Sequence, residues 1–157
     1  MSPCPAQVAR IMAVMNAAFD PAYGEAWNTR QVSDALTMPT THAIVVDAAG
    51  RRLTQPGEEA VPAGFVMTRQ GADEEELLLI AVRPDCRERG LAQELIAKAF
   101  ADARSRGVRR MFLEMRQDNP AEHLYRKVGF EPIGRRPKYY RLSNGLRVDA
   151  ITFGRTL

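Results

Sequence analysis

The stretch 77–92, which reads LLLIAVRPDCRERGLA, decides the fold of this 157-residue chain. Its apolar first part, up to Val82, is typical of a buried strand. A short segment with Pro84 follows, and a helix is expected to begin after the turn that contains Gly90. The first N–H groups of a helix have no partner within it, and the helix dipole favours negative charge there. The stretch therefore predicts a strand that leads to an anion-binding helix N-terminus.

The composition is that of a single globular domain, which we expect to span residues 1–157. Hydrophobic residues make up 45% of the chain and charged residues 26%, and the length suits one full hydrophobic core. No apolar run approaches the roughly 20 residues that a membrane span needs, and the first residues lack the pattern of a secretory signal. We therefore expect no membrane partner. The two cysteines, Cys4 and Cys86, make no disulfide framework, so a cytoplasmic location is expected.

The net charge of +3 gives the chain a mild preference for anionic partners. A phosphate-bearing cofactor explains this charge as well as nucleic acid does. Because so small an excess is weak evidence for nucleic acid, we expect no direct nucleic-acid binding.

Hydrophobic periodicity and end signals predict an alternation of helices and strands. The expected helices cover 5–19, 28–38, 90–106 and 119–128, and the expected strands cover 42–47, 63–69, 75–82, 108–115, 131–134 and 147–153. Asn28 and Gln31 have the spacing of a capping box, and residues 20–24 break the first helix. The segment 48–62 is expected to be an exposed, mobile loop, and the basic segment 135–140 a second loop.

The order of these elements predicts an α+β fold with a mixed, mostly antiparallel central sheet flanked by helices. Three successive strands suit an antiparallel meander, and the strand–helix–strand unit 75–115 suits a right-handed crossover between parallel neighbours. A doubly wound nucleotide-binding fold would repeat the strand–helix unit, so this order excludes it.

The turn 87–92 is the first candidate for chemistry. Gly90 lets the backbone approach a ligand closely, and Arg87 and Arg89 add positive charge, which suits a pyrophosphate. The alternative is a simple helix entry with solvated arginines. The strand before the turn and the long helix after it favour the pyrophosphate cradle.

Glu114 is the second candidate, because it lies in the otherwise apolar strand sequence MFLEM (111–115). A carboxylate is costly to bury, and burial raises a carboxyl pKa towards the value that a general base needs at neutral pH. The alternative is that strand alternation turns Glu114 towards solvent or that it pairs with Arg116. The strand alone does not decide between them.

Tyr125 is the third candidate. A phenol can donate a proton to a leaving thiolate, because its pKa of about 10 lies above the value of about 8.5 for a thiol. The alternative, a tyrosine that anchors its helix in the core, is the stronger interpretation for this residue taken alone.

The other reactive and aromatic side chains favour ordinary roles. We expect His123 at the surface and Cys86 to be an inert small residue. No His, Cys, Asp and Glu cluster has metal-ligand spacing, so no metal site is expected. Four aromatic residues could either wall an acceptor groove or plug the edges of the core: Tyr23, Trp27, Tyr139 and Tyr140.

Taken together, these motifs resemble the GNAT acetyltransferases, and within them the ribosomal-protein-alanine N-acetyltransferases (RimI type). The segment IAVRPDCRERGLAQELI (80–96) is similar to the strand and acetyl-CoA loop of the family, whose pattern Arg/Gln-x-x-Gly-x-Gly/Ala reads Arg87-x-x-Gly90-x-Ala92. The segment FLEMRQDNPAEHLYRKVGF (112–130) is similar to the following strand and helix, and GRRPKYY with DAITF is similar to the end of the family's domain. The resemblance covers 75–153 well and the first 70 residues loosely.

The resemblance implies acetyl-CoA as the acetyl donor and assigns the residues that bind it. The backbone of Ile80, Ala81 and Val82 would pair with the pantetheine arm like an added strand. Asn119 would contact the cofactor. The pyrophosphate would be bound at the loop formed by Arg87, Glu88, Arg89, Gly90, Leu91, Ala92 and Gln93.

The resemblance also implies direct acetyl transfer, with Glu114 as general base and Tyr125 as general acid. The acceptor it implies is the N-terminal α-amine of a protein, a small ribosomal protein above all. One alternative keeps the chemistry and changes the acceptor to a small amine or an internal lysine. The other is a non-catalytic module that binds acyl-CoA.

Overall fold

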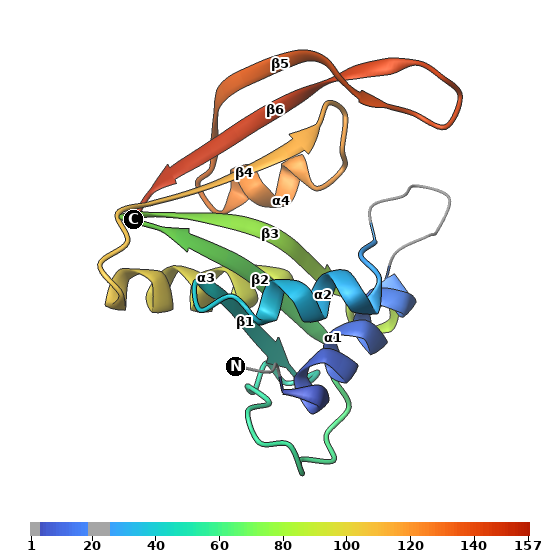
Figure 1. The fold of residues 1–157 in the computed structure, drawn as a ribbon, viewed down its shortest axis with the longest axis vertical. Coiled ribbons are helices and arrows are strands. Elements are labelled where there is room, and N and C mark those ends of the chain that lie inside the picture. Colours follow the sequence, from blue (N-terminus) through green and yellow to red (C-terminus); the bar gives the residue numbers. More distant parts are fainter. Residues whose placement is uncertain (1–3, 19–25) are drawn as a thin grey trace.

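Figure 1 shows the computed structural model, which describes residues 4–18 and 26–157. Its α-helices are α1 (Pro5–Ala18), α2 (Thr29–Leu36), α3 (Leu91–Ser105) and α4 (Glu122–Lys127), and a 3-10 turn covers Pro84–Cys86. Its strands are β1 (Thr41–Val46), β2 (Gly64–Gly71), β3 (Glu74–Val82), β4 (Arg110–Arg116), β5 (Glu131–Arg141) and β6 (Arg147–Thr156). The expected order of elements is confirmed. The expected helix break at 20–24 and Tyr23 lie outside the described residues.

The strands form one six-stranded sheet in the order β1-β2-β3-β4-β6-β5. All neighbours run antiparallel except β3 and β4, which are parallel and connected through α3. The α+β fold, the meander and the crossover are therefore confirmed. Within the described part of the chain, no helix is long and apolar enough to cross a membrane.

A β-bulge in β3 determines where the sheet opens. Met67 and Thr68 of β2 pair with Leu79 and Leu77 of β3, so Leu78 is an extra residue in β3. The pairing of β3 with β4 covers only the first three residues of β3. Because a bulge bends its strand, β3 turns away from β4 beyond this point, as Figure 1 shows.

Apolar side chains cover both faces of the β1–β3 part of the sheet and one face of β4 and β6. On one face α1 and α2 pack against β1, β2 and β3 around the fully buried Ile11, Met15 and Phe65. On the other face α3 and α4 pack around Leu95 and Phe130. The end of β3 thus lies between two helical layers.

The helix ends follow the expected signals at three positions. The side chain of Asn28 accepts from the N–H of Gln31, and the side chain of Gln31 accepts from the N–H of Asn28, both at 2.8 Å. Gly90 precedes α3 with a φ of +76° and Gly107 follows it with a φ of +83°, a left-handed conformation that favours glycine. Local chemistry alone therefore sets these boundaries.

The segment 48–62 is a mostly exposed loop, as the sequence predicts, but it is attached to the domain at two points. Leu53 is buried at 1% exposure, and Arg52 donates two hydrogen bonds, of 2.8 and 2.9 Å, to the Asp102 carboxylate on α3. These hydrogen bonds hold the pKa of Asp102 below its ordinary value, although burial opposes them. The buried Leu53 and the two hydrogen bonds from Arg52 to Asp102 attach the segment to the domain.

The prediction of a loop over 135–140 is wrong, because β5 continues through it to Arg141. The register with β6 shifts between Arg136 and Tyr140, and Lys138 has a φ of +52°. Pro137 lies inside this irregular part of an edge strand, where a residue without an N–H is tolerated. From the sequence alone, Pro137 and the surrounding basic residues suggest a loop, because the pairing with β6 is not visible there.

The expected start of the fourth helix at Asn119 is also wrong. The helix begins at Glu122, and the Asn119 side chain accepts from the N–H of Ala121 at 2.9 Å. Asparagine often makes such local turns in competition with helix capping. The expected end is confirmed, since Gly129 has a φ of +96°.

Glu75 and Arg106 form a buried ion pair that no sequence pattern suggests. Glu75 has no exposed surface, and its Oε1 lies 2.5 Å from Nη2 of Arg106 in the turn after α3. The pair joins β3 to the end of the crossover helix.

Candidate active site

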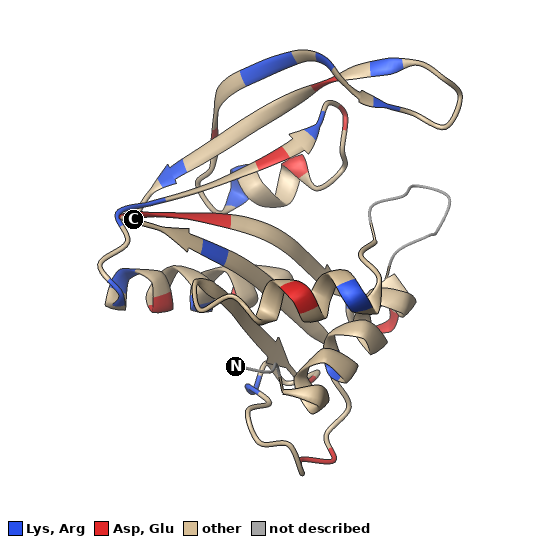
Figure 2. Ribbon diagram, in the orientation of Figure 1, with Lys and Arg blue, Asp and Glu red and all other residues tan. Residues whose placement is uncertain are grey.

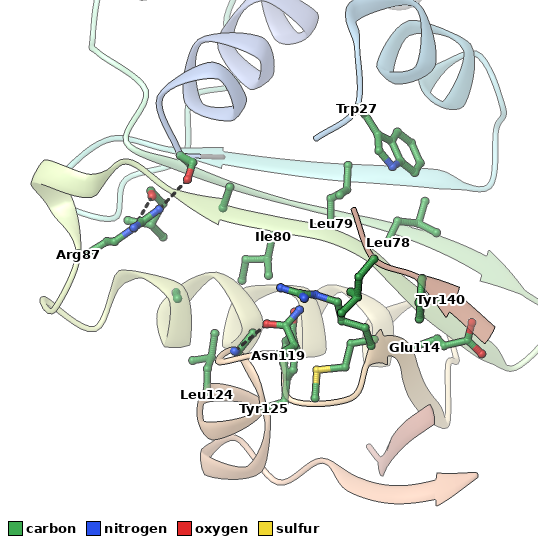
Figure 3. A pocket seen from close by; sticks show the side chains of 18 of the residues that line it. Trp27, Leu78, Leu79, Ile80, Arg87, Glu114, Asn119, Leu124, Tyr125 and Tyr140 are labelled. Atoms are coloured by element: carbon green, nitrogen blue, oxygen red, sulfur yellow. Dashed lines mark hydrogen bonds between the residues drawn. The ribbon is translucent and has the colours of Figure 1, made fainter. Parts of the chain in front are cut away.

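A cavity of about 860 Å³ opens where β3 separates from β4 (Figure 3). Its walls come from the ends of these two strands, from α4 and from the turn between β5 and β6. It therefore lies at the carboxyl ends of the parallel pair, where the crossover helix α3 also begins.

The end of β3 forms one wall of the cavity, as the sequence predicts. Ile80, Ala81 and Val82 all line it. Arg87 also lines it, but its side chain points back to the backbone, donating to the Val82 carbonyl at 3.2 Å and to the Ala18 carbonyl at 2.9 Å. In this state Arg87 ties the strand end to α1 (Figure 3).

The predicted anion loop forms the turn into α3. Glu88 and Gly90 both have a positive φ, of 64° and 76°, and a side chain at Gly90 would meet no atom within 4 Å. Ala92 lines the cavity and Leu91 is buried. The remaining loop residues are exposed or half-buried at the surface: Glu88, Arg89, Gly90 and Gln93.

Glu114 projects from β4 into the cavity. Its neighbours Leu113 and Met115 are buried in the core, so alternation turns the Glu114 side chain to the opposite face. That side chain is 20% exposed, and its Oε2 lies 3.2 Å from Nε of Arg136. The sequence left open whether Glu114 is buried, faces solvent or pairs with Arg116. In the structure its carboxylate is half-buried and pairs with Arg136.

Glu76 is a second carboxyl on this part of the sheet. It lies opposite Phe112 on β4, two residues before Glu114. Burial raises the pKa of Glu76, nearby Arg69 opposes the rise, and the charge of Glu114 adds to it. The sequence did not single out Glu76, which is one of three consecutive glutamates at the start of the expected strand 75–82.

Tyr125 enters the cavity from α4. It is 8% exposed, and its ring packs edge-on against Phe130 with centroids 5.8 Å apart. Tyr125 is thus both a core anchor and a cavity-lining residue, so the two interpretations of the sequence are compatible. Asn119 lines the same cavity beside it.

Of the three candidate aromatic residues that the structure describes, two line the cavity and one is exposed. Trp27, just before α2, and Tyr140, near the end of β5, both line the cavity (Figure 3). Tyr139 is 52% exposed and lies edge-on to Tyr140 with centroids 5.2 Å apart. Cys86 is buried, as an inert residue should be.

The charge around the cavity is mainly positive. Among the residues that the structure describes, the charged ones that line it are three arginines and one glutamate: Arg87, Arg116, Arg141 and Glu114. Figure 2 shows further Lys and Arg along β5 and at the start of β6. The sequence signal for this wall was the basic segment 135–140. Among the described residues, no group of three or more His, Cys, Asp or Glu could hold a metal ion.

Comparisons with known proteins agree on one family. A model of the acetyltransferase (GNAT) family matches residues 12–130. The [ribosomal protein bS18]-alanine N-acetyltransferase of Haemophilus influenzae is 33% identical over 88 residues, which are 56% of this chain and 60% of that protein. The protein of the same name from Escherichia coli K12 is 38% identical over 101 residues, 64% of this chain and 66% of that protein. Each match thus spans less than two thirds of the relative.

The fold extends this similarity over nearly the whole chain. The crystal structure of the ribosomal-protein-S18-alanine N-acetyltransferase from Escherichia coli superposes with a TM-score of 0.77 and 26% identity. The match covers 99% of this chain and 91% of that one.

Proposed function

The chain belongs to the GNAT acetyltransferase family, and we propose that it transfers the acetyl group of acetyl-CoA to the N-terminal α-amine of a protein. One observation carries this proposal: Glu114 and Tyr125, from different elements, line the same cavity as the strand end Ile80–Val82. A base, an acid and a strand end that can pair with an extended ligand are the parts that acyl transfer to an amine needs.

In the proposed binding mode, acetyl-CoA lies along the end of β3. The backbone of Ile80, Ala81 and Val82 pairs with the pantetheine arm, and Asn119 contacts the cofactor from the other wall. The amides from Glu88 to Gln93, at the start of α3, bind the pyrophosphate, because helix N-termini favour anions. Arg87 and Arg89 add positive charge to this site.

In the proposed reaction, the amine nitrogen bonds to the thioester carbonyl carbon and the carbon–sulfur bond breaks. Glu114 accepts the proton that the amine loses, directly or through water. Tyr125 donates a proton to the departing thiolate. An α-amine with a pKa of about 7.7–8.0 is easier to deprotonate than a lysine with a pKa near 10.4, so it suits a single carboxylate base.

We infer that the acceptor is the N-terminus of a small ribosomal protein and that the enzyme acts in the cytoplasm. This inference is supported by the names of the relatives, which specify the alanine of ribosomal protein bS18. The fold and the cavity support the chemistry, whereas these names support the acceptor.

A pair of peptides tests the acceptor class. We expect the purified protein with acetyl-CoA to acetylate an Ala-starting peptide and to leave its Nα-blocked, lysine-containing version unmodified, as measured by mass spectrometry. Modification of only the blocked peptide would instead indicate a lysine acetyltransferase. Binding of coenzyme A without modification of any amine would indicate a non-catalytic module.

Replacing Tyr125 by phenylalanine tests the general acid. The ring that packs against Phe130 is kept and only the hydroxyl is lost. We expect kcat to fall by about 100-fold, the lower end of typical acid catalysis, because a thiolate is already a fair leaving group. The fall in kcat should be smaller with an acetyl thioester of a more acidic thiol, because its thiolate leaves without needing a proton. A variant with the same kcat as the wild type for both donors contradicts this role.

A further inference from the structure

The ion pair between Arg136 and Glu114 leads to an inference that deepens the proposed function and rests on it. Nε of Arg136 lies 3.2 Å from Oε2 of Glu114, and the exposed fractions of the two side chains are 61% and 20%. The pair therefore joins an exposed guanidinium to Glu114, which lines the cavity.

The sheet register explains how Arg136 reaches across a whole strand to Glu114. On β6, Thr152 lies opposite Glu114 and Ala150 lies opposite Arg136. Directly opposite residues share a face of the sheet, and so do residues two apart on one strand. Both charged side chains thus project from one face, and only two small side chains lie between them.

Arg136 is held from a second side by an aromatic ring. Its guanidinium carbon lies 5.0 Å from the centroid of the Tyr139 ring, within cation–π distance. Tyr139 in turn packs edge-on against Tyr140, which lines the cavity. The guanidinium is therefore placed by its surroundings rather than by Glu114 alone.

We propose that Arg136 is a positioning residue for the general base. A glutamate side chain has several rotatable bonds, whereas a base must hold its oxygen within hydrogen-bond reach of the proton it takes. Arg136 binds Oε2 and so directs Oε1 of Glu114 towards the acceptor amine. Arg136 itself does not touch the substrate.

Arg135 provides a matched control on the same strand. It lies opposite Ile151, one residue along the register, so its side chain projects from the other face of the sheet. There it pairs with Asp149 at 2.8 Å and is 57% exposed, close to the exposure of Arg136. Arg135→Gln removes an ion pair of the same kind without touching Glu114.

The test is a kinetic double-mutant cycle with Arg136→Gln, Glu114→Gln and the double variant. We expect Arg136→Gln to lower kcat by about 10- to 100-fold, the cost of a misplaced catalytic group. The KM for acetyl-CoA should stay within about twofold of the wild type. In the Glu114→Gln background the same replacement should have no further effect, because a residue that acts through Glu114 loses its role with it. Arg136→Lys, which keeps a cation, should recover part of the loss.

Two outcomes would overturn the inference: an equal loss in both backgrounds, or an equal loss of kcat in Arg135→Gln. If the wild type leaves the Ala-starting peptide unmodified but acetylates a small amine, only the proposed acceptor is wrong. The double-mutant cycle is then measured with that amine. If the wild type acetylates no amine, the proposed function and this inference both fail.

Discussion

Glu114→Gln is expected to lower kcat by about 10²- to 10⁴-fold, the usual contribution of a general base. Glutamine keeps the size of the side chain and can still accept a hydrogen bond from Arg136, but it cannot take a proton from the amine. The affinity for coenzyme A should stay nearly unchanged, because the proposed cofactor contacts lie on β3, in the 88–93 loop and at Asn119. Steady-state kinetics with the Ala-starting peptide and calorimetry with coenzyme A measure the two quantities.

Glu122→Gln is the matched control for this experiment. Glu122 lies on α4 and forms a surface ion pair with Arg126, whose Nε is 2.8 Å from its carboxylate. Losing a carboxylate there should leave kcat within about twofold, since surface ion pairs contribute little. A fall in coenzyme A affinity as large as the fall in kcat would instead make Glu114 a binding residue.

The pH dependence of the Glu114→Gln defect gives a second, independent readout. The α-amine of a peptide has a pKa of about 7.7–8.0, so it is mostly protonated at pH 7 and mostly neutral at pH 9. An amine that is already neutral needs a base less. The ratio of wild-type to variant kcat should therefore shrink as the pH rises from 7 to 9. A ratio that stays constant over this range would mean that Glu114 does not accept the proton.

The sequence predicts those parts of the fold and the site that depend on local signals. Asn28 with Gln31 and Gly107 each fix a helix end through contacts within a few residues. The crossover from β3 to β4 places the Glu114 strand beside the strand that leads to the anion loop. Glu114 and Tyr125 lie 11 positions apart in the sequence and line one cavity, as the family resemblance implies.

The features that the sequence misses depend on contacts between distant residues. The bulge at Leu78 is hidden in a uniformly apolar run, because it shows only in the pairing with β2. The residues around Pro137 have the composition of a loop, and pairing with β6 makes them a strand. Arg136 could not be recognised as the partner of Glu114 without that pairing. The role that we propose for Arg136 therefore rests on a contact that no spacing rule encodes.

The sequence also misses the buried ion pair between Glu75 and Arg106, and Arg106→Gln tests its effect on stability. Glu75 has no exposed surface and lies 31 positions from Arg106 in the sequence. Removing the arginine would leave a buried carboxylate without its cation, which typically costs about 3–5 kcal/mol of unfolding free energy. Arg106 is 25% exposed, so water can reach the vacated space in part, and we expect about 3 kcal/mol. Urea denaturation at neutral pH measures this loss.

Arg104→Gln controls for the loss of a positive charge near the end of α3, because Arg104 is exposed. We expect it to change the unfolding free energy by no more than about 0.5 kcal/mol. Replacing both partners, as in Glu75→Leu with Arg106→Leu, should recover most of the stability, because apolar pairs often replace buried ion pairs without loss. If Arg106→Gln is as stable as Arg104→Gln, the pair does not hold the crossover in place. Recovery in the double variant would instead show that the cost lies in the unpaired carboxylate, and that β3 and α3 can pack together without charge.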